Sequence, residues 1–203
     1  MNLGVLFFLV LFPLLLLATS FTRIFIILSF MRKGLGEIGV PSGQILFGLA
    51  LLFSMLIMRD PFQKIYTNSM LPYMDGKISA SAMLKGSELP LRVFMSTQVA
   101  KSDLDFVNKY SQSTMEENDE ETSFVSLLGA FSLSELKKGL FMGFLIWIPF
   151  LIIDLVTSVF TTSAGLHHLN PALLSLPLKV LLFLALDGWK LLFGTIAESY
   201  WVR

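Results

Sequence analysis

The amino-acid sequence predicts an all-α membrane protein, made of kinked helical hairpins and a small helical domain outside the membrane. Of its 203 residues, 54% are hydrophobic and 15% are charged, whereas a typical soluble domain is about 25% charged. Four apolar stretches approach the ~20 residues that a membrane-spanning helix needs. Two of these stretches also carry prolines and charges, a combination that suits helices buried in protein or lining a water-filled cavity.

Residues 1–58 are expected to form an N-terminal membrane helical hairpin. Its first apolar stretch covers about residues 3–30 with Arg23 as its only charge, and its second, about residues 44–58, is short for a full span. Residues 1–18 have the apolar core of a signal peptide, but they lack a basic segment, and the apolar sequence continues beyond them. We therefore expect a retained first helix.

Residues 59–138 are hydrophilic and are expected to fold as a small, mostly helical domain. Short helical patterns cover residues 79–84, 89–100 and 104–110. Five acidic residues fall within residues 116–121. Such a run is typical of a solvated loop, and the alternative is a docking patch for a basic partner.

Residues 139–203 are expected to form a C-terminal kinked helical hairpin. Its two apolar stretches cover about residues 140–162 and 171–197, with Pro149 in the first and Pro177 in the second. A proline inside a helix lacks the backbone N–H and clashes with the preceding turn. We therefore expect a kink at each proline.

Four charged residues lie inside the apolar stretches: Arg23, Asp154, Lys179 and Asp187. Each costs roughly 2.5 to 3.5 kcal/mol at the centre of a membrane helix. Two acids and two bases make a neutral set, so ion pairs between helices or protomers can relieve this cost. We predict that Asp154 or Asp187 pairs with Lys179 and that the chain forms a homo-oligomer. The alternative role for these charges is a proton or ion pathway.

The orientation follows from the basic residues near the first connection. Arg32 and Lys33 lie between the first two apolar stretches. Short cytoplasmic loops carry an excess of Lys and Arg, so this connection is expected to face the cytoplasm. Both termini and residues 59–138 are then expected in the periplasm.

Several function classes find no support in the composition. The net charge is zero, which does not favour a nucleic-acid partner, and the absence of cysteine excludes disulfides and thiolate metal sites. Two intramembrane aspartates, Asp154 and Asp187, could suggest an aspartyl protease, but Asp187 lacks the glycine pair of the GxGD intramembrane proteases. His167 and His168 are adjacent, so on a helix they point about 100° apart and suit one metal poorly. We expect no enzymatic activity, no cofactor and no metal.

Several segments together resemble the FliP family of the flagellar type III protein-export gate. They are TSFTRIFIILSFMR (residues 19–32), VPSGQILFGLALLFSMLIM (40–58), PLRVFMSTQ with the later Asp103-Leu104, SLSELKKGLFMGFLIWIPFLIIDLV (132–156) and SLPLKVLLFLALDGW (175–189). The resemblance covers almost the whole chain in the right order. Several motifs of this length are far more specific than one short pattern.

The resemblance implies a core subunit of the export gate in the inner membrane, within the flagellar basal body. In that family several copies assemble with FliQ-like and FliR-like membrane subunits into a closed helical pore. The pore works with other export-apparatus proteins and passes unfolded flagellar proteins. The SctR proteins of virulence secretion are the close alternative, but Thr22 and Arg23 favour the flagellar group. A small ion channel or transporter is the alternative from another class.

One departure from the family falls between the third and fourth apolar stretches. The family has a methionine triplet after a glycine there, and those methionines close the pore. The matching positions here are Gly165 followed by Leu166, His167 and His168. The resemblance therefore implies a pore-closing loop in which leucine and two histidines replace the methionines, and a histidine there would respond to pH.

Overall fold

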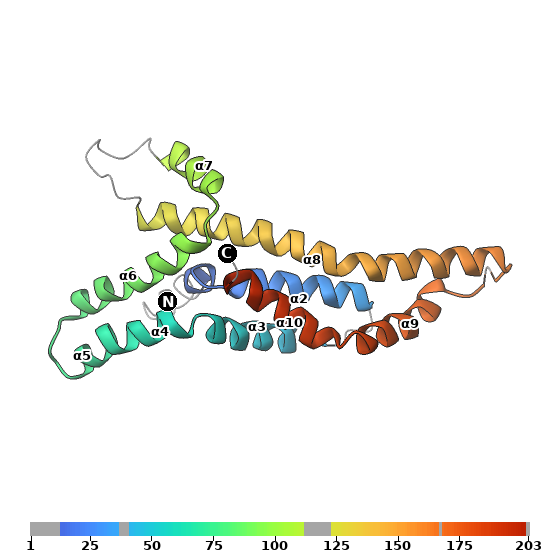
Figure 1. Ribbon diagram of the computed structural model, residues 1–203, viewed down its shortest axis with the longest axis horizontal. Coiled ribbons are helices and arrows are strands. Elements are labelled where there is room, and N and C mark those ends of the chain that lie inside the picture. Colours follow the sequence, from blue (N-terminus) through green and yellow to red (C-terminus); the bar gives the residue numbers. More distant parts are fainter. Residues whose placement is uncertain (1–12, 37–40, 112–122, 167, 202–203) are drawn as a thin grey trace, which may run out of the picture. The chain divides into compact units, whose positions relative to one another are not determined.

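The computed structural model describes residues 13–36, 41–111, 123–166 and 168–201, and this described part contains helices and no strands (Figure 1). The predicted all-α class is thereby confirmed. Residues 13–17 are helical. The later elements are α2 (Phe21–Leu35), α3 (Gly43–Ile57), α4 (Arg59–Ile65), the π-helical turn η1 (Tyr66–Met70), α5 (Leu71–Met74), α6 (Ala80–Gln98), α7 (Lys101–Ser111), α8 (Phe124–Ser163), α9 (Pro171–Ala185) and α10 (Gly188–Trp201).

Among the described residues, α8 is the one helix that is long and apolar enough to cross a membrane without a break. Its 40 residues begin at Phe124, well before the apolar stretch predicted from residue 140. Two further spans pass the same test only as bent pairs: α3 with Arg59–Met74, bent by 70°, and α9 with α10, bent by 61°. The first predicted stretch falls partly on residues 1–12, which lie outside the described residues.

The chain divides into two compact units: unit 1 is Met1–Thr22 with Leu51–Lys138, and unit 2 is Arg23–Ala50 with Gly139–Arg203. The division falls within α2, α3 and α8, because each unit takes a part of these helices. The sequence-based division into residues 1–58, 59–138 and 139–203 describes how the chain is arranged across a membrane. That division stays a prediction.

In unit 1, the segment from α4 to α5 packs beside α6. Helix α6 begins after Ser79, whose hydroxyl caps the first turn by accepting the Ala82 N–H at 3.3 Å. Gly86 permits the close approach of η1 to α6, because a Cβ at this position would lie 2.6 Å from the Ser69 hydroxyl oxygen. A larger residue at position 86 would force the two segments apart.

One hydrophobic cluster of unit 1 contains the buried side chains Ala18, Met95, Leu127 and Phe131. The ring of Phe94 meets Phe131 edge to face, with the ring centroids 5.8 Å apart. Burying a large apolar side chain contributes roughly 1.5–3 kcal/mol relative to leaving it exposed. This cluster therefore fixes the end of α6 against the N-terminal part of α8.

In unit 2, two glycines let α2 approach α8 closely. Gly139 and Gly143 are spaced as GxxxG, a pattern common where helices meet. A Cβ at Gly143 would lie 2.7 Å from the ring of Phe30, and one at Gly139 would lie 3.2 Å from the Cα of Arg23. The face of α2 that carries Arg23 therefore rests directly on the α8 backbone.

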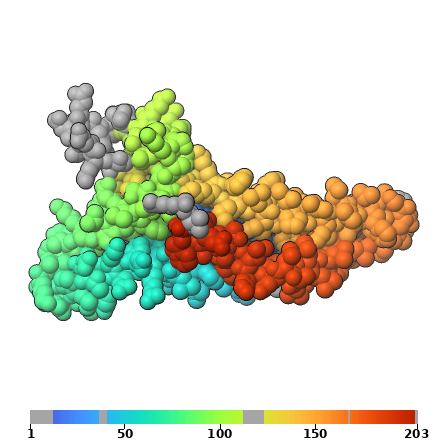
Figure 2. Space-filling model, in the orientation of Figure 1, coloured from blue at the N-terminus to red at the C-terminus, as the bar shows by residue number. Residues whose placement is uncertain are grey.

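The sharp bend in unit 2 lies between α9 and α10, and α8 and α9 each continue through their prolines as one helix. Asp187 has φ 49°, the left-handed conformation in which Asp is tolerated better than most residues. Its carbonyl accepts the Leu191 N–H at 3.1 Å, so α10 starts in a new direction. Figure 2 shows the red surface of α9 and α10 lying alongside the orange part of α8.

Candidate functional site

Asp154 of α8 and Lys179 of α9 form an ion pair in unit 2. Lys179 Nζ donates to Asp154 Oδ2 at 2.7 Å. The lysine side chain is 5% exposed and the aspartate side chain 43% exposed. Asn170 caps α9 by accepting the Ala172 N–H at 3.0 Å, and this fixes where α9 begins. A buried ammonium group needs a partner, and Asp154 supplies it.

Arg23 of α2 is buried and binds α10. Its Nη1 donates to the Ser199 carbonyl at 3.3 Å and to the Ser199 hydroxyl at 2.9 Å. The guanidinium carbon lies 3.8 Å from the centroid of the Tyr200 ring. A planar guanidinium can donate hydrogen bonds and stack on an aromatic ring at the same time. Sequence reasoning missed Ser199 and Tyr200, because neither residue type marks a partner for a buried arginine.

Asp187 lies at the α9–α10 bend and is exposed. The structure brings Asp154, not Asp187, to Lys179. The two acids that the sequence left as alternatives therefore differ in surroundings. Asp154 is a charge partner, and Asp187 shapes the backbone at the start of α10.

The predicted pore-closing loop follows α8. Gly165 has φ +71°, a conformation that favours glycine, and Leu166 donates its N–H to the Thr161 carbonyl at 2.9 Å. Leu166 is 40% exposed, and His168 is exposed. His167 lies outside the described residues. The loop ends α8 with an apolar side chain directed to the surface, and its closing role stays a prediction.

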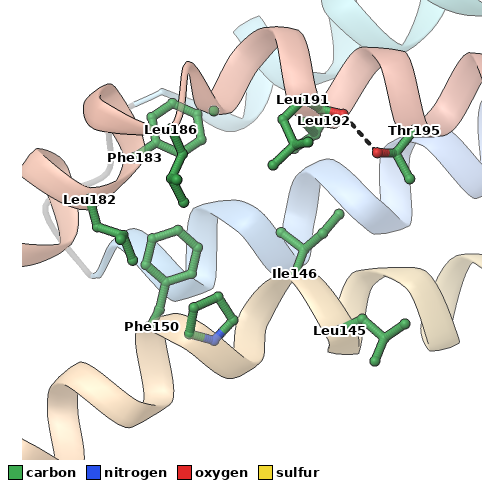
Figure 3. A pocket seen from close by; sticks show the side chains of 11 residues that line it. Leu145, Ile146, Phe150, Leu182, Phe183, Leu186, Leu191, Leu192 and Thr195 are labelled. Carbon is green, nitrogen blue, oxygen red and sulfur yellow. Dashed lines mark hydrogen bonds between the residues drawn. The ribbon is translucent and has the colours of Figure 1, made fainter.

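An apolar cavity of about 270 Å³ lies between α8 and the α9–α10 bend. Figure 3 shows Phe150 rising from α8 toward Leu182, and Leu186 pointing into the space between them. Pro149 and Gly188 also line it. Thr195 is the polar lining residue, and its hydroxyl donates to the Leu191 carbonyl at 2.8 Å. The cavity therefore offers room for apolar groups and no group for acid–base chemistry.

A second charged cluster lies in unit 1, where two of the motif segments meet. Ser134 Oγ donates to Asp103 Oδ2 at 2.7 Å and accepts the Ala100 N–H at 3.1 Å. Lys137 Nζ donates to Asp103 Oδ1, and Lys138 Nζ donates at 2.6 Å to the backbone carbonyl of Gln98, which closes the end of α6. The cluster thereby ties the α6–α7 corner to α8.

The protonation of Asp103 reflects this environment. Burial alone would raise the pKa of its carboxyl group. The hydrogen bonds from Lys137 and Ser134, together with the charges of Lys137 and Lys138, outweigh burial and hold the pKa below its usual value. Sequence reasoning missed this cluster, although Gln98, Asp103, Ser134 and the two lysines all belong to the motif residues quoted above.

Among the described residues, no group of three His, Asp or Glu side chains could hold a metal ion. The fold and its charged clusters thus define a class: an all-helical protein with a membrane-length helix, in which buried charges join one helix to another. The family model described as "FliP family" matches residues 5–196. The chain belongs to the FliP family.

Known relatives are similar over most of the chain. The "Flagellar biosynthetic protein FliP" of Bacillus subtilis (strain 168) is 38% identical over 187 residues, which are 92% of this chain and 85% of the relative. Proteins of the same name from Pectobacterium carotovorum subsp. carotovorum and Buchnera aphidicola subsp. Baizongia pistaciae (strain Bp) are 37% and 41% identical. The chain spans 72% of the Pectobacterium relative and about half (52%) of the Buchnera relative.

Proposed function

We propose that this chain is a non-catalytic core subunit of the flagellar type III export gate. With FliQ-like and FliR-like membrane subunits and further copies of itself, it forms the closed channel through which unfolded flagellar proteins pass. The observation that carries the proposal is the family match over residues 5–196, with relatives named as flagellar biosynthetic proteins. Those names favour the flagellar system over the SctR alternative.

Exposed apolar side chains support assembly with other subunits. In unit 1, Leu89 is 65% exposed and Val93 is 53% exposed. These residues are four positions apart on α6 and share one face of the helix. Contiguous apolar surface on a domain that faces water marks a protein contact, and such contacts are what a multi-copy gate requires.

The gate lies in the bacterial inner membrane, with residues 59–138 in the periplasm. The apolar part of α8 supports membrane insertion, and Arg32 and Lys33 in the last turn of α2 support a cytoplasmic end there. The ion pair of the buried Lys179 with Asp154 fits this setting, because it neutralises charges that lipid would not tolerate.

The native mass of the detergent-solubilised complex tests the proposal. We expect a large multi-copy assembly when FliQ-like and FliR-like proteins are co-expressed, and we expect these proteins to co-purify. A monomer or dimer that partners leave unchanged would refute the gate role and favour a small transporter. Restoration of motility in a flagellated strain that lacks its own FliP protein would separate the flagellar role from the virulence role.

The pore-closing role belongs to the loop of Gly165, Leu166, His167 and His168. Replacing residues 166–168 by glycine should raise ion leakage through the assembled gate, because the obstructing side chains are removed. The measurement is ion flux into vesicles that contain the complex. A control carries glycine at Asp75 and Lys77, an exposed ion pair in unit 1. Equal leakage from both variants would exclude this loop as the closure.

A further inference from the structure

Unit 2 contains a cavity of about 630 Å³ beside the ion pair of Asp154 and Lys179. The C-terminal end of α2, the later part of α8 and the first half of α9 line it. Its polar lining consists of Lys33, Asp154, Ser158, Asn170, Ser175 and Lys179. Leu35, Leu173 and Leu176 are its larger apolar lining residues. The cavity therefore offers polar groups and apolar side chains to one ligand.

The charged groups of this cavity sum to a positive charge. Lys179 lies 2.7 Å from Asp154, so these two charges neutralise each other. Lys33 is exposed and forms no ion pair with any residue that the structure describes. One positive charge thus remains at the mouth, and the buried ammonium of Lys179 forms part of the wall. An anionic group with several acceptor oxygens matches this arrangement.

The cavity also lies where an apolar helix surface meets polar helix ends. Lys33 stands in the last turn of α2, and α2 stops before Gly36, which has φ +108°. Leu173, which lines the cavity, is 67% exposed. In a bilayer, basic side chains at the end of an apolar helix reach the headgroup layer while exposed leucines face the acyl chains.

We propose that this cavity binds the phosphate group of an anionic phospholipid. Lys33 is the cation that contacts the phosphate oxygens, the Lys179–Asp154 pair forms part of the wall beside them, and Leu173 lies against an acyl chain. Basic pockets between the helices of membrane proteins bind anionic headgroups in this way. The inference needs unit 2 to lie in a membrane but does not need the export role. A small native mass would therefore leave it standing.

Lipid titration of the purified full-length protein in neutral detergent tests the proposal. Phosphatidylglycerol should raise the melting temperature and remain bound in native mass spectrometry, whereas phosphatidylcholine should do neither to a comparable degree. Lys33→Gln should weaken phosphatidylglycerol binding roughly fivefold, the factor expected for one lysine near an anionic lipid. Lys33→Arg should keep the affinity, because the charge is retained.

Lys190→Gln is the matched control. Lys190 is an exposed lysine of unit 2 that does not line this cavity, so the same change of charge should leave the affinity unaltered. Equal losses of phosphatidylglycerol affinity in Lys33→Gln and Lys190→Gln would overturn the proposal. They would show that the lipid is attracted by positive charge in general and not bound in this cavity. Inorganic phosphate that reproduces the whole stabilisation would also overturn it in favour of a free-anion site.

Discussion

Each unit contains a carboxylate–lysine pair that ties α8 to another helix. The aspartate is the buried partner in unit 1, and the lysine is the buried partner in unit 2. In unit 1 the Asp103 side chain is 4% exposed and its partner Lys137 is 60% exposed. In unit 2 the Lys179 side chain is 5% exposed and its partner Asp154 is 43% exposed. In each pair, the buried charge loses its hydration and depends on its neighbours.

The two buried charges differ in the number of groups that compensate them. Asp103 accepts hydrogen bonds from Ser134 and Lys137, and Lys138 adds a favourable charge. Lys179 has one described hydrogen-bond partner, Asp154. Redundant donors protect the pair of unit 1 against loss of one partner, so the pair of unit 2 is expected to be the more sensitive one.

The largest expected effect is that of Asp154→Asn. This change leaves the buried ammonium of Lys179 without its carboxylate, and breaking a buried pair in this way costs about 3 kcal/mol. For a chain of this size that corresponds to a fall of roughly 6–12 °C in melting temperature. The measurement is thermal unfolding of the purified protein in detergent.

Lys179→Met provides the comparison for Asp154→Asn. It removes the buried charge and leaves Asp154, which water can reach, so the loss should stay within about 1 kcal/mol. The double variant Asp154→Asn/Lys179→Met should recover most of the stability lost in Asp154→Asn. If Lys179→Met lowers the stability as much as Asp154→Asn does, then the different burial of Lys179 and Asp154 does not determine the effect of breaking this pair.

Ser134→Ala should have the next largest effect. It removes a hydrogen bond to Asp103 and leaves the Ala100 N–H without its acceptor, which costs about 1–3 kcal/mol. Lys137→Gln removes an exposed partner and should cost about 0.2–1 kcal/mol. Hydrogen exchange of peptides covering residues 98–104 measures both variants, and a larger effect of Lys137→Gln would contradict the argument from redundant donors.

The smallest expected effect is the pH dependence of the unit 1 cluster. Because the folded-state pKa of Asp103 is lowered, its stabilising contribution is complete above the usual carboxyl pKa of about 3.9. The contribution is lost as the pH falls through the lower folded-state pKa. The protection of amides 98–104 against hydrogen exchange, relative to their intrinsic exchange rate at each pH, should therefore fall in acid more in the unmodified protein than in Asp103→Asn. The same acid response in both proteins would assign it to other groups.

Hydropathy predicted the helical class, but it could not locate the breaks. Residues 171–197 appear as one apolar stretch because Asp187 is flanked by leucine, glycine and tryptophan. The structure places a 61° bend there. The available signal was the Asp-Gly pair at residues 187–188, a common turn dipeptide. A kink was expected at Pro177, and this proline lies inside α9, which continues through it as one helix.

The charged sites were predictable only in part. The cost of burying Lys179 predicts that it has a partner, but sequence spacing left Asp154 and Asp187 as alternatives. The choice depends on how α9 folds back onto α8, which is a long-range contact. Asp103 and Ser134 are 31 residues apart, so no local pattern links them. Arg23 was singled out by its charge, but Tyr200 stacks on it from the far end of the chain.

The length of α8 has a consequence for its surroundings. At about 1.5 Å per residue, its 40 residues extend about 60 Å, and the hydrocarbon layer of a bilayer is about 30 Å thick. A membrane can therefore cover only about half of this helix. Where a bilayer surrounds the apolar part of α8, the remaining residues of the helix have to be covered by water or by protein.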